Sequence, residues 1–338
     1  MSLPEILIAV VWAGLTLYAI LGGADFGAGV LHVLAPAGRR GRRRRQAITG
    51  AMGPVWEANH VWLVFFLTGL LTLFPGAFSA LGAAVLVPGT LALLGIVVRG
   101  AAFAFAGQLT GFDRARRPLQ IAFGVASAAT PLVFGATAAG LARQRLVVDG
   151  TTVRSGGGTA LWLGPFQLEV GVMAVAACTA LAAAFLTVEM RRADEVVLAR
   201  AFRGAALWAT AVTALLAAGG LALAALDAPV LFRGLTGRGL PAVLAGLVAL
   251  GVALAALAGA RDRVARAALA AAMAALVWGW GLAQFPRLVG RHVTVATAAD
   301  PAELHVLAIA LAAGVALLLP ALCLLYGAFR RHPTEVPR

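Results

Sequence analysis

Apolar stretches without a charged side chain recur along the whole 338-residue chain. Six of them run over residues 118–142, 170–188, 204–226, 239–260, 267–286 and 306–329. Each is close to the roughly 20 residues that an α-helix needs to cross about 30 Å of hydrocarbon. This pattern predicts six membrane-spanning helices in the later part of the chain.

The N-terminal third of the chain holds three more predicted spans. Residues 6–37 are interrupted only by Asp25 and His32, and residues 58–98 only by His60. About forty residues are too many for one crossing, so Pro75-Gly76 is the expected turn between two helices. Residues 1–5 lack the basic side chains of a secretory signal, so the first span is expected to remain as a helix. We therefore predict an all-α, polytopic membrane protein with about nine transmembrane helices in helical bundles.

Short connections between the spans predict a single integral membrane domain over residues 1–338. A span ends at Phe74-Pro75 and a later one at Phe285-Pro286, which suggests four-helix halves over 1–142 and 160–286, with a last helix over 303–330. Asp149-Gly150 between β-branched residues predicts a small hairpin in the longest loop.

The composition is that of a membrane protein, and the positions of the arginines account for the positive net charge. Apolar residues make up 61% of the chain and charged residues only 12%, against roughly 25% in soluble domains. The net charge of +13 comes from arginine alone, and most arginines fall in loops on one side of the predicted membrane, over 39–45, 114–117, 191–203, 261–266 and 330–338. Positive residues remain cytoplasmic, so we expect the N-terminus outside, the C-terminus inside, membrane lipids as neighbours and no nucleic-acid partner.

Three charged side chains fall inside predicted spans: Asp25, Glu57 and Arg99. Charge at membrane depth is costly and therefore indicates where function is to be sought. Each lies about a dozen residues from a predicted cytoplasmic loop, so at roughly 1.5 Å per residue all three belong to the cytoplasmic half of the membrane. We expect one shared polar cluster, in which Arg99 pairs with an acid. The alternative is a buried salt bridge that only fixes helix packing.

One arginine facing two acids leaves one carboxyl group able to bind and release protons. We prefer Glu57, because polar and aromatic residues surround it in the sequence and His60, three residues later, is within reach for proton exchange on a helix. The predicted proton pathway consists of Glu57, Asp25, His60 and Trp62, with Arg99, Asn59 and Trp56 as supporting side chains.

Two further patterns near these residues need interpretation. Gly23 and Gly27 are four residues apart, so they either let another helix approach closely or belong to an unwound, site-forming segment. His32 and His60 lie in different spans, but His32 falls near the cytoplasmic end of the first one. Two histidines that bind one haem must face each other at one depth, so we expect neither haem ligands nor a metal site in this chain.

The quoted segments resemble subunit II of the cytochrome bd-type quinol oxidases. The resemblance is specific over residues 1–105, where it rests on the run from Gly23 to Gly29 around Asp25-Phe26, the run from Pro54 to Leu63, Phe74-Pro75 and Arg99. Beyond Gln108 it rests on the number of spans, Glu189-Met190-Arg191 and Phe285-Pro286. Two positions depart from the family pattern: the loop after Pro286 is less aromatic, and Glu57 replaces the Asp of some members.

The resemblance implies a multi-pass protein of the bacterial cell (inner) membrane. It further implies a haem-binding subunit I as partner, carrying b-type and d-type haems, with quinol and oxygen as substrates of the complex. This chain would carry no haem and would help deliver cytoplasmic protons to the oxygen-reducing centre. The resemblance leaves room for small accessory subunits and a structural quinone or lipid. The residues alone leave two alternatives: a proton-coupled transporter that uses Asp25 and Glu57, and a purely structural helix bundle.

Overall fold

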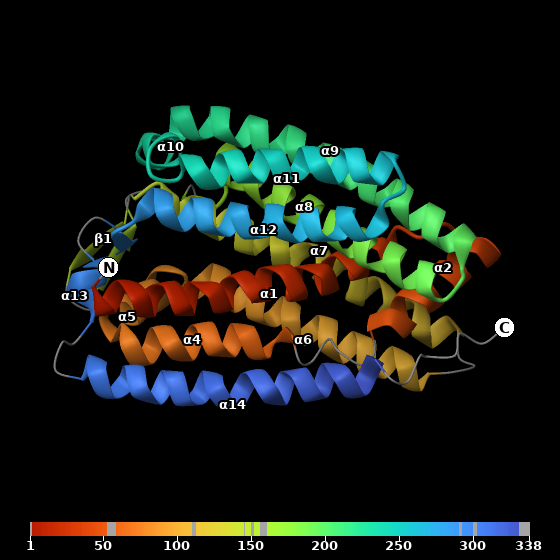
Figure 1. Cartoon of the computed structure of the whole chain (residues 1–338), viewed down its shortest axis with the longest axis horizontal. Coiled ribbons are helices and arrows are strands. Elements are labelled where there is room, and N and C mark those ends of the chain that lie inside the picture. The colour runs from red at the N-terminus through yellow and green to blue at the C-terminus, as the bar shows by residue number, and fades with distance from the viewer. Residues whose placement is uncertain are drawn as a thin grey trace.

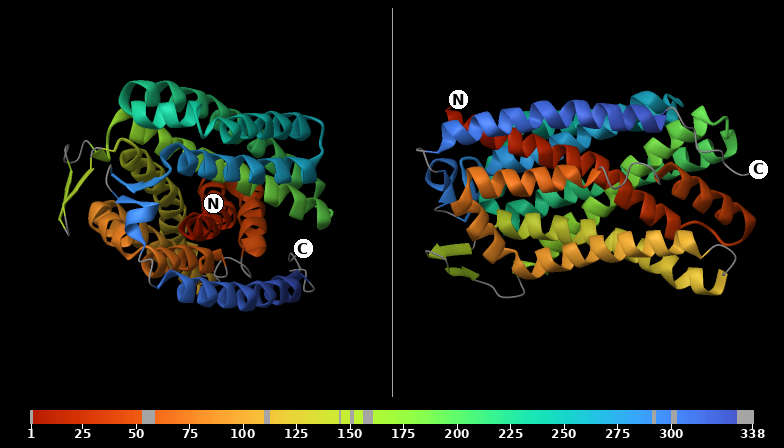
Figure 2. Two further views of the ribbon diagram at one scale, coloured as in Figure 1. Left: turned by 60° about the vertical axis from the view of Figure 1, so that its left-hand side comes forward. Right: turned by 90° about the horizontal axis from the view of Figure 1, so that it is seen from below.

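The fold is a bundle of long helices that share one axis (Figures 1 and 2). The computed structural model describes residues 2–52, 59–109, 113–144, 146–149, 152–155, 161–290, 293–299 and 303–330. Within these residues, eight helices are long and apolar enough to cross a membrane. They are α1 (Leu3–Val33), α6 (Leu86–Gln108), α7 (Asp113–Ala142), α8 (Pro165–Arg192), α9 (Val196–Asp227), α11 (Leu240–Ala258), α12 (Asp262–Gln284) and α14 (Leu304–Arg330).

Shorter elements connect these helices or cover the ends of the bundle. The helices are α2 (Gly38–Met52), α4 (Val61–Leu73), α5 (Pro75–Ala84), α10 (Pro229–Thr236) and α13 (Val295–Ala298). The strands β1 (Leu146–Asp149) and β2 (Thr152–Ser155) pair antiparallel, with Asp149 opposite Thr152, which confirms the predicted hairpin. A second antiparallel pair joins β3 (Arg287–Val289) and β4 (Val293–Thr294).

A short helix that we did not predict lies between the second and third spans. The chain breaks at Phe74, as expected, and the apolar helix α4 before it corresponds to the second predicted span. Pro75, however, opens the short helix α5, because proline fits the first helical turn, where its missing N–H is not needed. The long helix α6 begins only at Leu86, so the third span runs over 86–108. No charged residue between 61 and 98 marks this second break in the sequence.

Helix α1 occupies a central position in the bundle. It packs against α4, α7, α8 and α12, while α6 pairs with α7, α8 with α9, and α11 with α12. Helix α14 lies along α4 on the side away from α11 (Figure 1). The division into four-helix halves stays a prediction.

The glycines around Asp25 serve helix packing. Helix α1 is continuous from Leu3 to Val33, so an unwound segment there is wrong. A Cβ atom at Gly27 would collide with the main-chain carbonyl of Cys178 in α8, and one at Gly23 would lie 3.3 Å from the Cys178 Sγ atom. The absence of side chains at these positions lets α1 and α8 approach each other closely.

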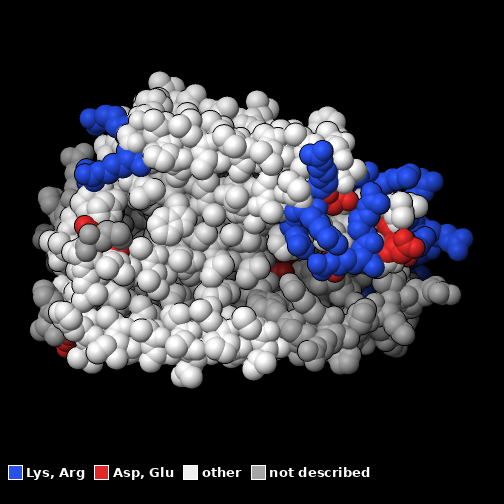
Figure 3. Space-filling model, viewed as in Figure 1, with Lys and Arg blue, Asp and Glu red and all other residues white. Residues whose placement is uncertain are grey.

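Arginines gather at one end of the bundle (Figure 3). The segment that holds Arg39 to Arg45 is helical, α2, rather than the loop that we expected, because arginine favours helix and the Arg45 Nη1 atom donates to the Ala35 carbonyl, 3.0 Å away. Helix α1 starts at the opposite end, and α14 finishes near the arginine-rich end (Figure 1). Which end faces the cytoplasm stays a prediction.

Candidate functional site

Three of the predicted site residues meet inside the bundle. Asp25 in α1, Asn59 just before α4 and Arg99 in α6 are 8%, 5% and 1% exposed. The Asn59 Nδ2 atom donates a hydrogen bond of 2.6 Å to the Asp25 Oδ2 atom. The Arg99 Nη2 atom donates one of 3.1 Å to the main-chain oxygen of Asp25. Polar groups from three separate segments are therefore joined at one point of α1.

Helix α7 supplies further contacts to Arg99. The Arg99 Nε atom donates to the Ser127 hydroxyl at 3.2 Å, and this hydroxyl donates to the Phe123 carbonyl at 2.6 Å. The rings of Phe26 and Phe123 lie 5.1 and 5.5 Å from the guanidinium carbon, where their faces attract the cation. The fully buried arginine is thus held by both α1 and α7.

Ser127 was missed by the sequence reasoning. It lies in an apolar span, and a serine in a membrane helix commonly bonds only to a carbonyl of its own helix, as Ser127 also does. Only its position beside Arg99 distinguishes it, and that position depends on how α6 and α7 pack. The sequence carries no signal for this contact.

Two predicted site residues, Glu57 and Trp56, lie outside the described residues. The choice of Glu57 as the acid that is left free to carry protons is therefore not tested. Two hydrogen bonds of Arg99 go to the main chain of Asp25 and to Ser127.

His60 and Trp62 contact aromatic side chains of α1 near this polar cluster. The His60 ring meets Tyr18 of α1 edge-on, with 5.9 Å between the ring centroids. Trp62 is 8% exposed and packs in one apolar cluster with Tyr18, Phe26 and Leu322. The Tyr18 hydroxyl and the Trp62 indole nitrogen are buried, and neither has a hydrogen-bond partner among the described residues. Tyr18 is a second neighbour of the site that the sequence reasoning missed.

The two histidines of the predicted spans lie at different levels of the bundle. His60 contacts Tyr18, whereas His32 meets Phe123 edge-on at 5.4 Å. Tyr18 and His32 are separated by about 21 Å along α1 at 1.5 Å per residue. Among the described residues, no group of three or more His, Cys, Asp or Glu side chains is placed to hold a metal ion.

A second shielded acid, Glu169, lies in α8 and was not predicted. Both of its carboxylate oxygens are buried. The carboxylate lies against α9, since a Cβ atom at Gly220 would be 2.6 Å from the Glu169 Oε2 atom. The sequence offered one signal, a lone acid at the edge of an apolar stretch, but we took that acid as the end of the span.

The family model for cytochrome bd terminal oxidase subunit II matches residues 3–329. The chain belongs to this family. Two relatives from Bacillus subtilis (strain 168) are similar over shorter segments. A putative cytochrome bd menaquinol oxidase subunit II is 26% identical over 128 residues, which cover 38% of this chain and 36% of the relative. A cytochrome bd ubiquinol oxidase subunit 2 is 30% identical over 104 residues, which cover 31% and 29%.

A solved structure of bd oxidase from Geobacillus thermodenitrificans has the same fold. The match has a TM-score of 0.71 and 23% sequence identity, and it covers 97% of this chain and 99% of that one. The family and the eight apolar helices together make this chain a multi-pass protein of the bacterial cell membrane. Membership of an oxidase subunit family favours the oxidase over the transporter that the residues alone left open.

Proposed function

We propose that this chain is the haem-free second subunit of a quinol:oxygen oxidoreductase and carries cytoplasmic protons toward the oxygen-reducing centre of its partner. The observation that supports this proposal is the buried network of Asp25, Asn59 and Arg99 in a chain of this family. An acid, an amide and a guanidinium are buried together inside the bundle. Burying such groups at membrane depth costs free energy, and buried groups of this kind are typical of proton pathways in membranes.

The proposal uses both acids of the N-terminal third of the chain. Glu57 is two residues before Asn59 in the sequence, and Asn59 donates a hydrogen bond to the Asp25 carboxylate. We propose that the carboxyl groups of Glu57 and Asp25 serve the same pathway. In this proposal, two carboxyl groups near one buried arginine would provide a step along which a proton can pass.

We assign the proton-carrying role to Glu57. Asp25 and Arg99 position it, while His60 and Trp62 line the pathway, with Asn59 and Trp56 as support. The haem-binding subunit I is the proposed partner, with b-type and d-type haems, and quinol and oxygen are the substrates of the complex. Small accessory subunits and a structural quinone or lipid are compatible with this assignment.

Substitution of Glu57 tests the assignment. Glu57→Gln keeps the shape and hydrogen-bonding capacity but removes the exchangeable carboxyl proton, so we expect quinol-driven oxygen uptake per mole of haem to fall while the complex still assembles. Glu57→Asp is the matched control, since it restores the acid with a shorter side chain, and it should retain most of the activity. Normalisation to haem separates turnover from yield.

Asp25→Asn and Arg99→Ala should act differently. Breaking a buried charged pair costs about 3 to 5 kcal/mol, so these variants should lower the yield of assembled complex. Full oxygen uptake per haem in Glu57→Gln would show that protons travel elsewhere. A buried salt bridge that only fixes helix packing would then be the better account of the cluster.

A further inference from the structure

A basic pocket lies at the α10 end of the bundle, opposite the main arginine cluster. Its volume is about 800 Å³, and three arginines from different segments line it: Arg233, Arg238 and Arg287. Arg233 belongs to α10, Arg238 to the turn before α11, and Arg287 to β3. Figure 3 shows basic side chains at this end too, well apart from the larger cluster. The pocket is therefore remote from the arginine-rich end of the molecule.

The positive charges of this pocket are not neutralised by the chain itself. No acidic residue is among the described residues that line it. The Arg238 Nη1 atom donates to the Phe285 carbonyl at 3.0 Å, the Arg287 Nη1 atom donates to the Gln144 Oε1 atom at 2.7 Å, and Arg233 bonds to a carbonyl of its own helix. These acceptors are neutral, and each guanidinium has five N–H donors. Most of those donors remain available to a ligand.

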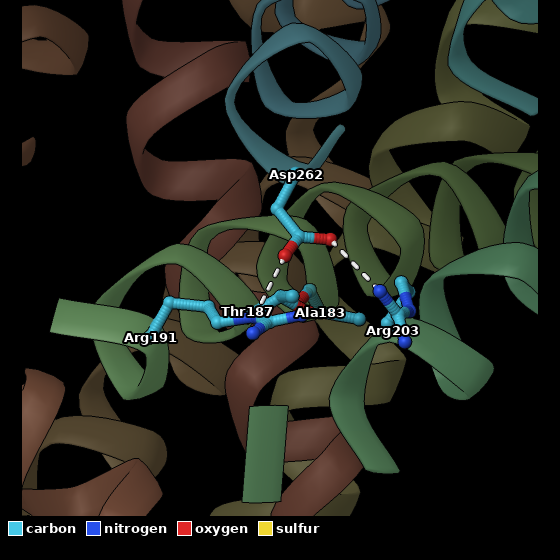
Figure 4. Close-up of polar contacts among 5 residues, drawn as sticks. All are labelled: Ala183, Thr187, Arg191, Arg203 and Asp262. Atoms are coloured by element: carbon cyan, nitrogen blue, oxygen red, sulfur yellow. Dashed lines mark hydrogen bonds and ion pairs between the residues drawn. The ribbon is translucent and has the colours of Figure 1, made fainter. Parts of the chain in front are cut away.

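The pocket at the opposite end of the bundle provides a contrast. It has a volume of about 460 Å³ and is also rich in arginine, but its lining includes Asp262. The Asp262 carboxylate pairs with Arg191 at 3.2 Å and with Arg203 at 3.8 Å (Figure 4). There the protein supplies its own negative charge. In the α10 pocket, a ligand has to supply it.

We propose that Arg233, Arg238 and Arg287 bind a phosphate group, and that its source is the headgroup of a membrane phospholipid. Planar guanidinium groups bind phosphate oxygens in pairs, so three arginines that converge at the end of the bundle suit the phosphate of a lipid headgroup. Two leucines close in sequence to the lining residues, Leu226 and Leu240, are 82% and 40% exposed. Leu226 is four residues before Val230 and Leu240 is two residues after Arg238, and Val230 and Arg238 both line the pocket. The exposed apolar side chains of the two leucines suit acyl chains, which a soluble phosphate would not use.

The predicted orientation strengthens this inference. Arginine is disfavoured on the outer face of a membrane protein, where the α10 end is predicted to lie. Arg143, also at this end, pairs with Asp227 at 2.6 Å. The three pocket arginines have no such described partner, so an anionic ligand explains why they converge. The proposal concerns a site apart from the proton pathway and does not depend on it.

Lipid retention by the purified oxidase complex tests the proposal. Arg233 and Arg238 are both exposed, so the double variant Arg233→Gln/Arg238→Gln should fold normally. After detergent exchange, native mass spectrometry should show about one phospholipid fewer per complex than in the unmodified protein. The matched control is Arg39→Gln/Arg200→Gln, which removes two exposed arginines outside the pocket and should retain the full complement.

Inorganic phosphate distinguishes the two sources of the ligand. In delipidated complex, we measure the midpoint of thermal unfolding with added phosphate, in the unmodified protein and in both double variants. Loss of the phospholipid from the pocket variant alone supports the lipid headgroup. Loss of only the phosphate-induced stabilisation supports a binding site for soluble phosphate and overturns the lipid assignment. Equal lipid retention and equal stabilisation in all three proteins would overturn the site itself.

Discussion

Ser127 illustrates how one small side chain determines the environment of a buried charge. It is fully buried, accepts a hydrogen bond from the Arg99 Nε atom and donates one to the Phe123 carbonyl. It also faces Gly29 of α1, where a Cβ atom would collide with the Ser127 hydroxyl. The Arg99 guanidinium therefore keeps its orientation toward Asp25 through a contact on a third helix.

Removal of this hydroxyl should weaken the complex. Ser127→Ala leaves a buried N–H of a charged group without its acceptor, which costs about 1 to 3 kcal/mol. We expect a lower midpoint of thermal unfolding in the purified complex. The same change at the exposed Ser79 of α5 serves as the control. Equal midpoints for Ser127→Ala and Ser79→Ala would mean that Ser127 does not stabilise Arg99.

At the scale of the elements, close helix approach depends on glycine. Membrane helices gain no hydrophobic driving force from leaving lipid, so van der Waals packing between backbones provides much of their association. Gly27 permits this contact between α1 and α8, whereas at Gly251 in α11 no atom beyond the adjacent backbone of its own helix lies within 4 Å of the place where a Cβ would be.

These two glycines should respond in opposite directions to the same substitution. Gly27→Ala inserts a methyl group against the Cys178 carbonyl, so α1 and α8 must separate and the yield of assembled complex should fall. Gly251→Ala should leave it unchanged or slightly raised, because alanine favours helix by about 1 kcal/mol over glycine. The measurement is haem-containing complex per cell mass. A normal yield for Gly27→Ala would show that α1 and α8 do not need this close contact.

Asp262 joins three helices at the arginine-rich end of the bundle. It begins α12 and pairs with Arg191 of α8 and Arg203 of α9 (Figure 4). Asp262→Asn keeps the shape but removes the charge, and we expect a loss of about 1 to 3 kcal/mol, seen as a lower thermal midpoint of the complex. Asp194→Asn removes the same charge from an exposed turn and is the control. No difference between the two variants would mean that the ion pairs add nothing to stability.

At the scale of the whole molecule, charge distribution and topology are linked. The arginines gather at the end that contains α2, and the β1–β2 hairpin lies at the opposite end (Figures 2 and 3). The positive-inside rule then predicts that α2 is cytoplasmic and the hairpin is outside.

Reporter fusions test this orientation directly. A fluorescent protein that matures only in the cytoplasm should give signal when fused within α2, and a phosphatase active only outside should give signal within the hairpin around Asp149. The reverse pattern would invert the membrane orientation and place the Asp25 network in the outer half of the membrane.

The sequence alone determined the membrane class, most of the spans, the hairpin and the polar residues at membrane depth. These properties depend on local rules: the length of an uncharged stretch relative to bilayer thickness, turn-forming residues and the cost of buried charge. The short helix α5 was not predicted, because a uniformly apolar run contains no mark of a break between α5 and α6.

Only the tertiary structure decided which atoms meet. Asp25 and Arg99 are 74 residues apart, and their contact uses a main-chain oxygen that no sequence pattern identifies. Ser127, the Gly27 contact and the three-arginine pocket likewise depend on how each helix is rotated about its axis. In a soluble protein an apolar stripe would reveal that rotation. Here lipid and protein interior are both apolar, so packing between distant helices determines it.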